Sequence, residues 1–163
     1  MSAAQIIAAN QNSKPITIQP ITDKEGLHEA YKRPTQLYIH GDTMYIAGTN
    51  DKQDIYDDLK IPFNQTDKTL RYKNAIKLLD VNPDVTNFVG HSLGGATALE
   101  LQKNLKYKTY NVNTYGAPVA SFTHSGNRYR NQYDPVSILD SGAQTTFNPT
   151  LNPHTYDNFD TNK

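Results

Sequence analysis

The chain contains no cysteine, so disulfides, thiolate metal sites and a cysteine nucleophile are all excluded. The chain also has no net charge at neutral pH, because its 16 Lys and Arg residues balance its 16 Asp and Glu residues. This balance gives no electrostatic basis for binding nucleic acid or an anionic membrane surface. No motif calls for a cofactor, and we expect neither a bound metal nor an organic cofactor.

Long apolar runs are absent too. None approaches the length needed to span a bilayer. The N-terminus has no basic start, and Gln5 interrupts its short apolar stretch, unlike a secretory signal. We therefore expect a cytoplasmic protein, or one that is packaged and delivered by a non-classical route, for example within a virion.

The length of 163 residues predicts one domain. We place this domain at residues 21–163, after an N-terminal segment, residues 1–20, whose first dozen residues we expect to be loosely ordered. Hydrophobic residues make up only 36% of the chain and the mean hydropathy is -0.70, which favours a compact core under a polar surface. No internal repeat appears.

Apolar periodicity and turn residues predict an alternation of strands and helices. We expect an edge strand within residues 16–21 and a helix from Asp23, as its cap, to Tyr31. A hairpin turning at Gly41-Asp42 follows. The other expected helices cover residues 51–60, 67–79 (capped by Asp67) and 94–106. The other expected strands include residues 88–89, 109–115 and 127–133, and we expect loop from residue 137 onward. This alternation implies a parallel sheet covered by helices.

The motif Gly90-His-Ser92-Leu-Gly94 lies between an apolar strand end, residues 88–89, and the expected helix 94–106. Strand, sharp turn and helix are the context of a G-x-S-x-G nucleophile elbow. Ser92 would take a strained backbone conformation, and glycine on either side would let strand and helix pass closely. We therefore interpret Ser92 as a nucleophile and expect His91 to help orient the turn.

A serine hydroxyl needs a base, and that base needs an orienting acid. In this kind of site the order along the chain is Ser, then acid, then His. Of the five histidines, His154 best fits the base because it follows an acid at a strand end. His124, in the loop between two expected strands, is the alternative base.

Asp134 is the favoured acid, because it ends an expected strand and Pro135 restrains the loop that presents it. An Asp-Pro pair is also common in simple turns. Asp140 is the rival acid, and Asp157 lies too close to His154 in sequence to be the obvious partner.

An oxyanion hole needs two donors. The backbone N–H of Leu93, directly after the nucleophile, is one candidate. Gly48-Thr49 ends the second hairpin strand, and the N–H of Thr49 is the other.

With these segments identified, the chain resembles the class 3 lipase family, the fungal triacylglycerol lipase type of α/β-hydrolase. The resemblance rests on residues 46–49 (IAGT), 54–59 (DIYDDL), 89–96 (VGHSLGGA), 114–118 (TYGAP), 133–136 (YDPV) and His154. It implies an α/β-hydrolase fold of reduced size, with a mostly parallel sheet and helices on both faces. It also implies triad roles for Ser92, Asp134 and His154, and oxyanion roles for Thr49 and Leu93.

The chain departs from the family pattern at several points. Ala47 stands where the family usually has arginine before the Gly-Thr pair, and a His-x-Gly-Phe element and long N-terminal helices are missing. The region where a lid would fall, residues 60–68, is short and only lightly apolar. These departures count against activation at a lipid interface and against bulky triglycerides as substrates.

We expect a serine hydrolase that cleaves carboxylic esters, most of all lipid esters, with transient contact to a membrane surface. Two alternatives stay open: an esterase or thioesterase for small soluble substrates, and a lipase-like binding or assembly module with little catalysis. Candidates for the walls of an acyl pocket are Phe63, Val119, Phe122, Val136, Ile138 and Leu139.

Overall fold

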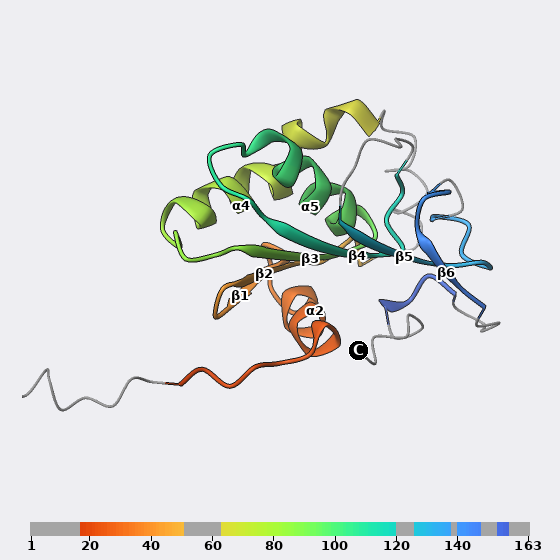
Figure 1. Ribbon diagram of the computed structural model, residues 1–163, viewed down its shortest axis with the longest axis horizontal. Coiled ribbons are helices and arrows are strands. Elements are labelled where there is room, and N and C mark those ends of the chain that lie inside the picture. The colour runs from red at the N-terminus through yellow and green to blue at the C-terminus, as the bar shows by residue number, and fades with distance from the viewer. Residues whose placement is uncertain (1–16, 51–62, 120–125, 138–139, 148–152, 157–163) are drawn as a thin grey trace, which may run out of the picture.

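A six-stranded sheet forms the centre of the protein (Figure 1). The structure, a computed structural model, describes residues 17–50, 63–119, 126–137, 140–147 and 153–156. The strands are β1 (Leu37–His40), β2 (Thr43–Ile46), β3 (Asn87–His91), β4 (Asn111–Tyr115), β5 (Asn127–Asn131) and β6 (Gln144–Thr146). They lie in the sheet in the same order as in the chain.

Strands β1 and β2 form the expected antiparallel hairpin, with Leu37 opposite Ile46 and His40 opposite Thr43. Gly41 in its turn has a φ of 59°, a conformation that glycine adopts without steric cost. All other neighbouring strands are parallel. The sheet is therefore mixed and mostly parallel, as predicted.

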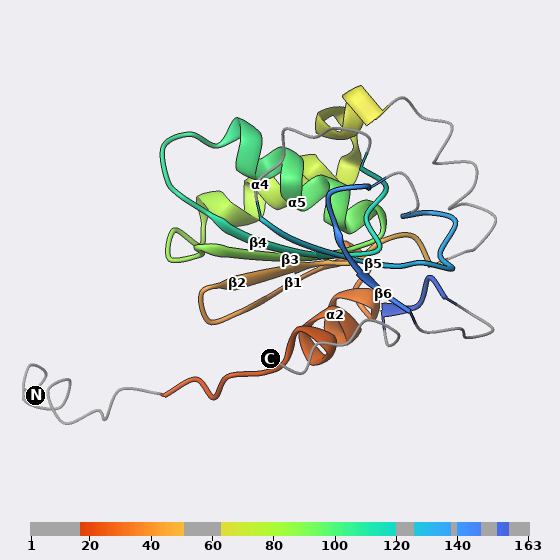
Figure 2. The ribbon, with the colours of Figure 1, turned by 45° about the vertical axis from the view of Figure 1, so that its right-hand side comes forward.

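Helices cover both faces of this sheet (Figures 1 and 2). Helix α4 (Leu70–Asp80) connects β2 to β3, and α5 (Leu93–Asn104) connects β3 to β4. Parallel crossovers are right-handed, so crossovers between strands added in one direction place their helices on the same face. Helix α2 (Asp23–Tyr31), which precedes β1, packs on the opposite face against β1, β2 and β3.

The two core layers follow from the alternation of side chains along each strand. On β2, Met44 and Ile46 face the core that α4 and α5 cover. Tyr45 and Ala47 face the smaller core under α2, with Leu27 of that helix. Strand β2 is thus apolar on both sides, as expected of a strand in a sheet between helices.

Both predicted helix caps are wrong by one or two residues. Thr22, not Asp23, is the N-cap of α2, because its hydroxyl accepts from the N–H of Glu25 while the Glu25 carboxylate accepts from the Thr22 N–H. Thr69, not Asp67, caps α4. Asp67 instead lies in a 3-10 helix, η1 (Phe63–Lys68), which precedes α4.

Two strand predictions also need correction. The described part of the expected edge strand, residues 17–21, forms no strand, and Pro20 lacks the N–H that a ladder needs. Conversely, β6 lies in a stretch predicted to be loop, and its short polar sequence carries no strand pattern. The helix expected at residues 51–60 lies outside the described residues.

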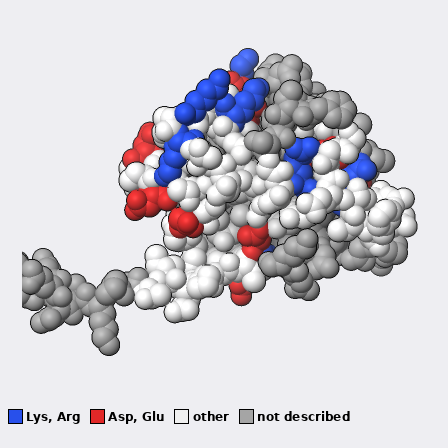
Figure 3. Space-filling model, in the orientation of Figure 1, with Lys and Arg blue, Asp and Glu red and all other residues white. Residues whose placement is uncertain are grey.

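On the face seen in Figure 3, side chains of both charge signs appear, in keeping with the zero net charge. Among the helices that the structure describes, none has the length and apolar character needed to cross a bilayer.

Candidate active site

The carboxyl ends of the parallel strands bring the predicted site residues to one edge of the sheet. Thr49 follows β2, Ser92 follows β3 directly, and Asp134 lies three residues after β5. Ligands bind at this edge in open α/β sheets. His154 reaches the same edge in a short segment, residues 153–156, near the end of the chain.

Ser92 lies at a strained turn between β3 and α5. Its φ of 55° and ψ of -130° lie in a region that L-residues rarely adopt. A methyl group at Gly90 would come within 2.5 Å of the Gly94 carbonyl oxygen, and one at Gly94 would collide with the backbone of Ile46. The motif therefore has the backbone of a nucleophile elbow, and both glycines are needed for close approach.

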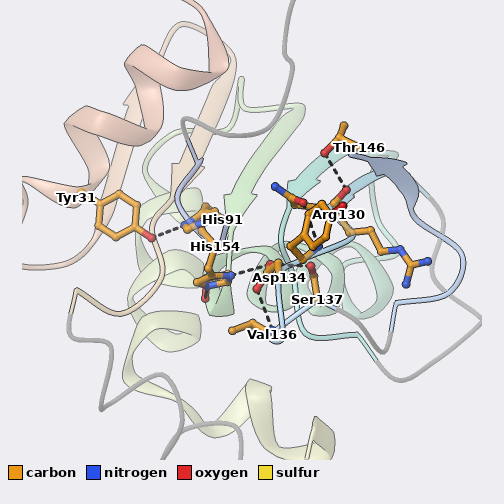
Figure 4. A network of polar contacts seen from close by, with 11 residues as sticks. Tyr31, His91, Arg130, Asp134, Val136, Ser137, Thr146 and His154 are labelled. Carbon is orange, nitrogen blue, oxygen red and sulfur yellow. Dashed lines mark hydrogen bonds and ion pairs between the residues drawn. The ribbon is translucent and has the colours of Figure 1, made fainter. Parts of the chain in front are cut away.

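A continuous chain of hydrogen bonds joins Ser92, His154 and Asp134. The Ser92 Oγ lies 2.7 Å from Nε2 of His154. The other ring nitrogen, Nδ1, lies 2.8 Å from Oδ2 of Asp134 (Figure 4). Because the carboxylate only accepts, Nδ1 carries the proton, and Nε2 is left to accept from the serine hydroxyl. This is the arrangement that makes a serine hydroxyl nucleophilic.

Asp134 is fully buried and firmly held. Its Oδ1 accepts from the Val136 N–H at 2.9 Å, and its Oδ2 accepts from the Ser137 hydroxyl at 2.7 Å (Figure 4). The first bond closes an Asx turn over Pro135. The Asp134-Pro135 pair therefore forms a turn that also holds the carboxylate against His154.

The rival acid, Asp140, has a different partner. Its Oδ2 lies 3.0 Å from Nε of Arg128 on β5, and both side chains are buried. Asp140 also accepts from Arg128 through Oδ1 at 3.2 Å. The structure thus joins Asp134, not Asp140, to His154. The alternative base His124 lies outside the described residues, as does Asp157.

Leu93 and the loop that carries Thr49 both lie next to Ser92. Leu93 is the first residue of α5, where backbone N–H groups have no partner within the helix. The loop after β2 passes close to Ser92, since a methyl group at Gly48 would lie 2.7 Å from the Ser92 Cβ. This contact places Gly48, the residue before Thr49, beside the serine.

His91 is a functional candidate that sequence reasoning treated only as an aid to the turn. Its Nδ1 lies 2.5 Å from the Tyr31 hydroxyl, and its Nε2 lies 2.6 Å from the carbonyl oxygen of His154. Burial, reinforced by the neighbouring His154, lowers the pKa of His91 to about 3. The ring is therefore neutral at physiological pH.

Aromatic contacts hold the segment of His154 against α2. The Tyr156 ring stacks on that of Tyr31, with centroids 5.4 Å apart, and its hydroxyl lies 3.0 Å from Nδ1 of His28. Tyr156 also contacts His91 edge to face at 5.6 Å. The sequence offers one weak indication of this cluster. His28 and Tyr31 are three residues apart, so in the predicted helix they lie on the same face.

The acyl-pocket candidates are placed only in part. Val136 is buried beside Asp134, while Val119 belongs to the core under α4 and α5. Phe122, Ile138, Leu139 and the Phe63 side chain lie outside what the structure describes.

Within the described ranges, no group of three or more His, Asp or Glu side chains is arranged to hold a metal ion. Comparison with protein-family models and with curated protein sequences found no match to this chain.

Proposed function

We propose that this protein is a serine hydrolase of the α/β-hydrolase fold that cleaves carboxylic esters through an acyl-enzyme. The observation that carries the proposal is the hydrogen-bonded series Ser92, His154 and Asp134 at 2.7 Å and 2.8 Å, starting from a strained elbow. Chance rarely gives a positive φ to a serine that also contacts a histidine paired with a buried aspartate.

In the proposed mechanism, the Ser92 Oγ attacks the ester carbonyl carbon while Nε2 of His154 takes the hydroxyl proton. Asp134 keeps the proton on Nδ1 and stabilises the imidazolium that forms. The N–H groups of Leu93 and Thr49 donate to the developing oxyanion. His154 then protonates the leaving alcohol, and a water that it deprotonates releases the acid from Ser92.

The proposed substrate class is a lipid ester, including a phospholipid acyl chain, in line with the resemblance of the motifs to class 3 lipases. Small soluble esters and thioesters would use the same residues, because the chemistry at the carbonyl is the same. Substrate size is therefore the variable that an assay must resolve.

A fluorophosphonate probe tests the reaction class. We expect it to label Ser92 of the wild-type protein and to leave Ser92→Ala unlabelled, since the probe reacts only with an activated serine. A folded wild-type protein that does not label would contradict the proposal and would leave a binding or assembly module as the better description.

A panel of substrates tests the class of ester. It comprises short and long p-nitrophenyl esters, a thioester and a phospholipid, each run beside Ser92→Ala. A kcat/KM that rises with acyl length would support a lipid ester. A preference for the acetyl ester, with no cleavage of phospholipid, would contradict it.

A further inference from the structure

His91 lies between two parts of the proposed site that are far apart in sequence. On one side it contacts Tyr31 at the end of α2, and on the other the backbone of His154 (Figure 4). The Tyr31 hydroxyl in turn accepts from the N–H of Gly48, at 3.1 Å, in the loop proposed to form the oxyanion hole. A series of hydrogen bonds thus runs from the oxyanion loop to the residue of the base.

Chemistry sets the direction of each bond in this series. The carbonyl oxygen of His154 can only accept, so Nε2 of His91 carries the ring proton. Nδ1 of the neutral ring is then an acceptor, and the Tyr31 hydroxyl donates to it. The tyrosine oxygen remains free to accept from Gly48, which the geometry shows.

Both groups keep these protonation states over a wide pH range. His91 is almost wholly buried and neutral, so it does not compete with His154, whose ring centroid is 5.0 Å away, for a proton. Burial also raises the pKa of Tyr31 to about 12, so its hydroxyl stays a donor. The serine hydroxyl is engaged by Nε2 of His154, at 2.7 Å.

The base needs such support because of where it lies. Residues 153–156 form turns rather than a strand. No hydrogen bonds to a neighbouring strand of the sheet therefore fix the backbone of His154. A displacement of about 1 Å in a reacting group can cost about 100-fold in rate. The hydrogen bond from Nε2 of His91 holds the backbone of His154, and the imidazole of that residue must stay within hydrogen-bond distance of Ser92.

We propose that Tyr31 and His91 are positioning residues, which fix the backbone of His154 and couple it to the oxyanion loop at Gly48. The proposal rests on the proposed function, because it assigns a role within the same site. Neither residue touches the reacting atoms. Their effect is to hold the imidazole and the oxyanion donors in one mutual arrangement.

The first test uses the wild-type protein and needs no variant. Long-range ¹H–¹⁵N correlation spectra of the histidine rings report the tautomer and its titration. We expect His91 to be the Nε2–H tautomer and to stay neutral from pH 5 to pH 9. An Nδ1–H tautomer, or protonation above pH 5, would overturn the proposal.

The second test compares variants by esterase kinetics. His91→Phe keeps a ring but removes both nitrogens, and Tyr31→Phe removes only the hydroxyl. We expect kcat to fall about 10- to 100-fold in each, with KM changed less than about 3-fold, because orientation rather than substrate binding is lost. His91→Gln should recover part of this loss, since its amide nitrogen can donate where Nε2 did.

Tyr38→Phe is the matched control. The Tyr38 hydroxyl also lies near a histidine nitrogen, that of His40, but on β1 beside the hairpin turn. We expect this variant to keep wild-type kcat. Equal activities for Tyr31→Phe and Tyr38→Phe, or a folded His91→Gln no faster than His91→Phe, would overturn the proposal.

Labelling rates separate this proposal from the proposed function. A folded wild type that fails to label with the fluorophosphonate defeats both. A wild type that labels, with Tyr31→Phe and His91→Phe labelling at the same rate, defeats only the positioning role. Thermal melting of each variant, run beside the kinetics, restricts the comparison to folded protein.

Discussion

Oδ2 of Asp134 accepts two hydrogen bonds, one from Nδ1 of His154 at 2.8 Å and one from the Ser137 hydroxyl at 2.7 Å. The bond from Ser137 holds the carboxylate in place, and the same oxygen still faces the imidazole of His154. Asp134 is therefore held by its own loop as well as by the histidine. This local support makes Asp134 the most sharply testable member of the proposed triad.

Asp134→Asn should lower kcat by about 10⁴-fold without unfolding the protein. An amide N–H facing Nδ1 favours the tautomer that carries its proton on Nε2, and this tautomer cannot accept from Ser92. The measurement is esterase kcat on a short p-nitrophenyl ester. Asp140→Asn is the matched control, and an equal loss of kcat in its folded fraction would show that the acid is wrongly assigned.

Leu93→Pro tests the oxyanion donor that follows the nucleophile. Leu93 is the first residue of α5, a position where proline fits a helix while removing the backbone N–H. We expect kcat of Leu93→Pro to be about 100-fold lower than kcat of Leu93→Ala. Both variants remove the leucine side chain, but the alanine variant keeps the backbone N–H donor. Similar kcat values for the two variants, with helix content retained, would exclude this donor.

The pair of Arg128 and Asp140 should matter for stability rather than chemistry. Arg128→Met leaves a buried carboxylate without its cation, which typically costs about 3 kcal/mol or more in the free energy of unfolding. The double variant Arg128→Met with Asp140→Leu should recover most of that loss, since no buried charge remains. Urea unfolding at neutral pH measures both, and a double variant no more stable than the single one would contradict the explanation.

His91 should make the protein less stable as the pH falls below neutral. Its pKa is about 3 in the folded protein and 6.5 as a free side chain. Between these values the unfolded chain binds a proton that the folded protein does not, so the free energy of unfolding falls with pH. At pH 5 the contribution amounts to about 2 kcal/mol.

Urea unfolding at pH 7.5 and pH 5 checks this expectation. The drop in stability between the two pH values should be about 2 kcal/mol smaller in His91→Gln than in wild type, because a glutamine does not titrate. Identical drops would show that His91 is not buried in a neutral form.

Sequence patterns predicted the central elements well where a local rule acts. Gly41-Asp42 marked the hairpin, and the glycines around Ser92 marked the turn from β3 into α5. Both cap predictions were wrong. Thr22 and Asp23 are both good capping residues, but Thr22 has Glu25 three residues on, the capping-box pattern that the prediction of Asp23 overlooked. Strand β6 was missed because pairing with β5, rather than its own composition, makes it a strand.

The turn at Ser92 follows from the local sequence, since the strain at Ser92 and the close approach at Gly90 and Gly94 are local demands of the backbone. Which histidine meets the serine, and which acid meets that histidine, depends on the tertiary structure. His154 is 62 residues from Ser92 and 20 from Asp134, and Tyr31 is 60 from His91. Such contacts depend on how the sheet edge and α2 bring distant loops together, which no local pattern records.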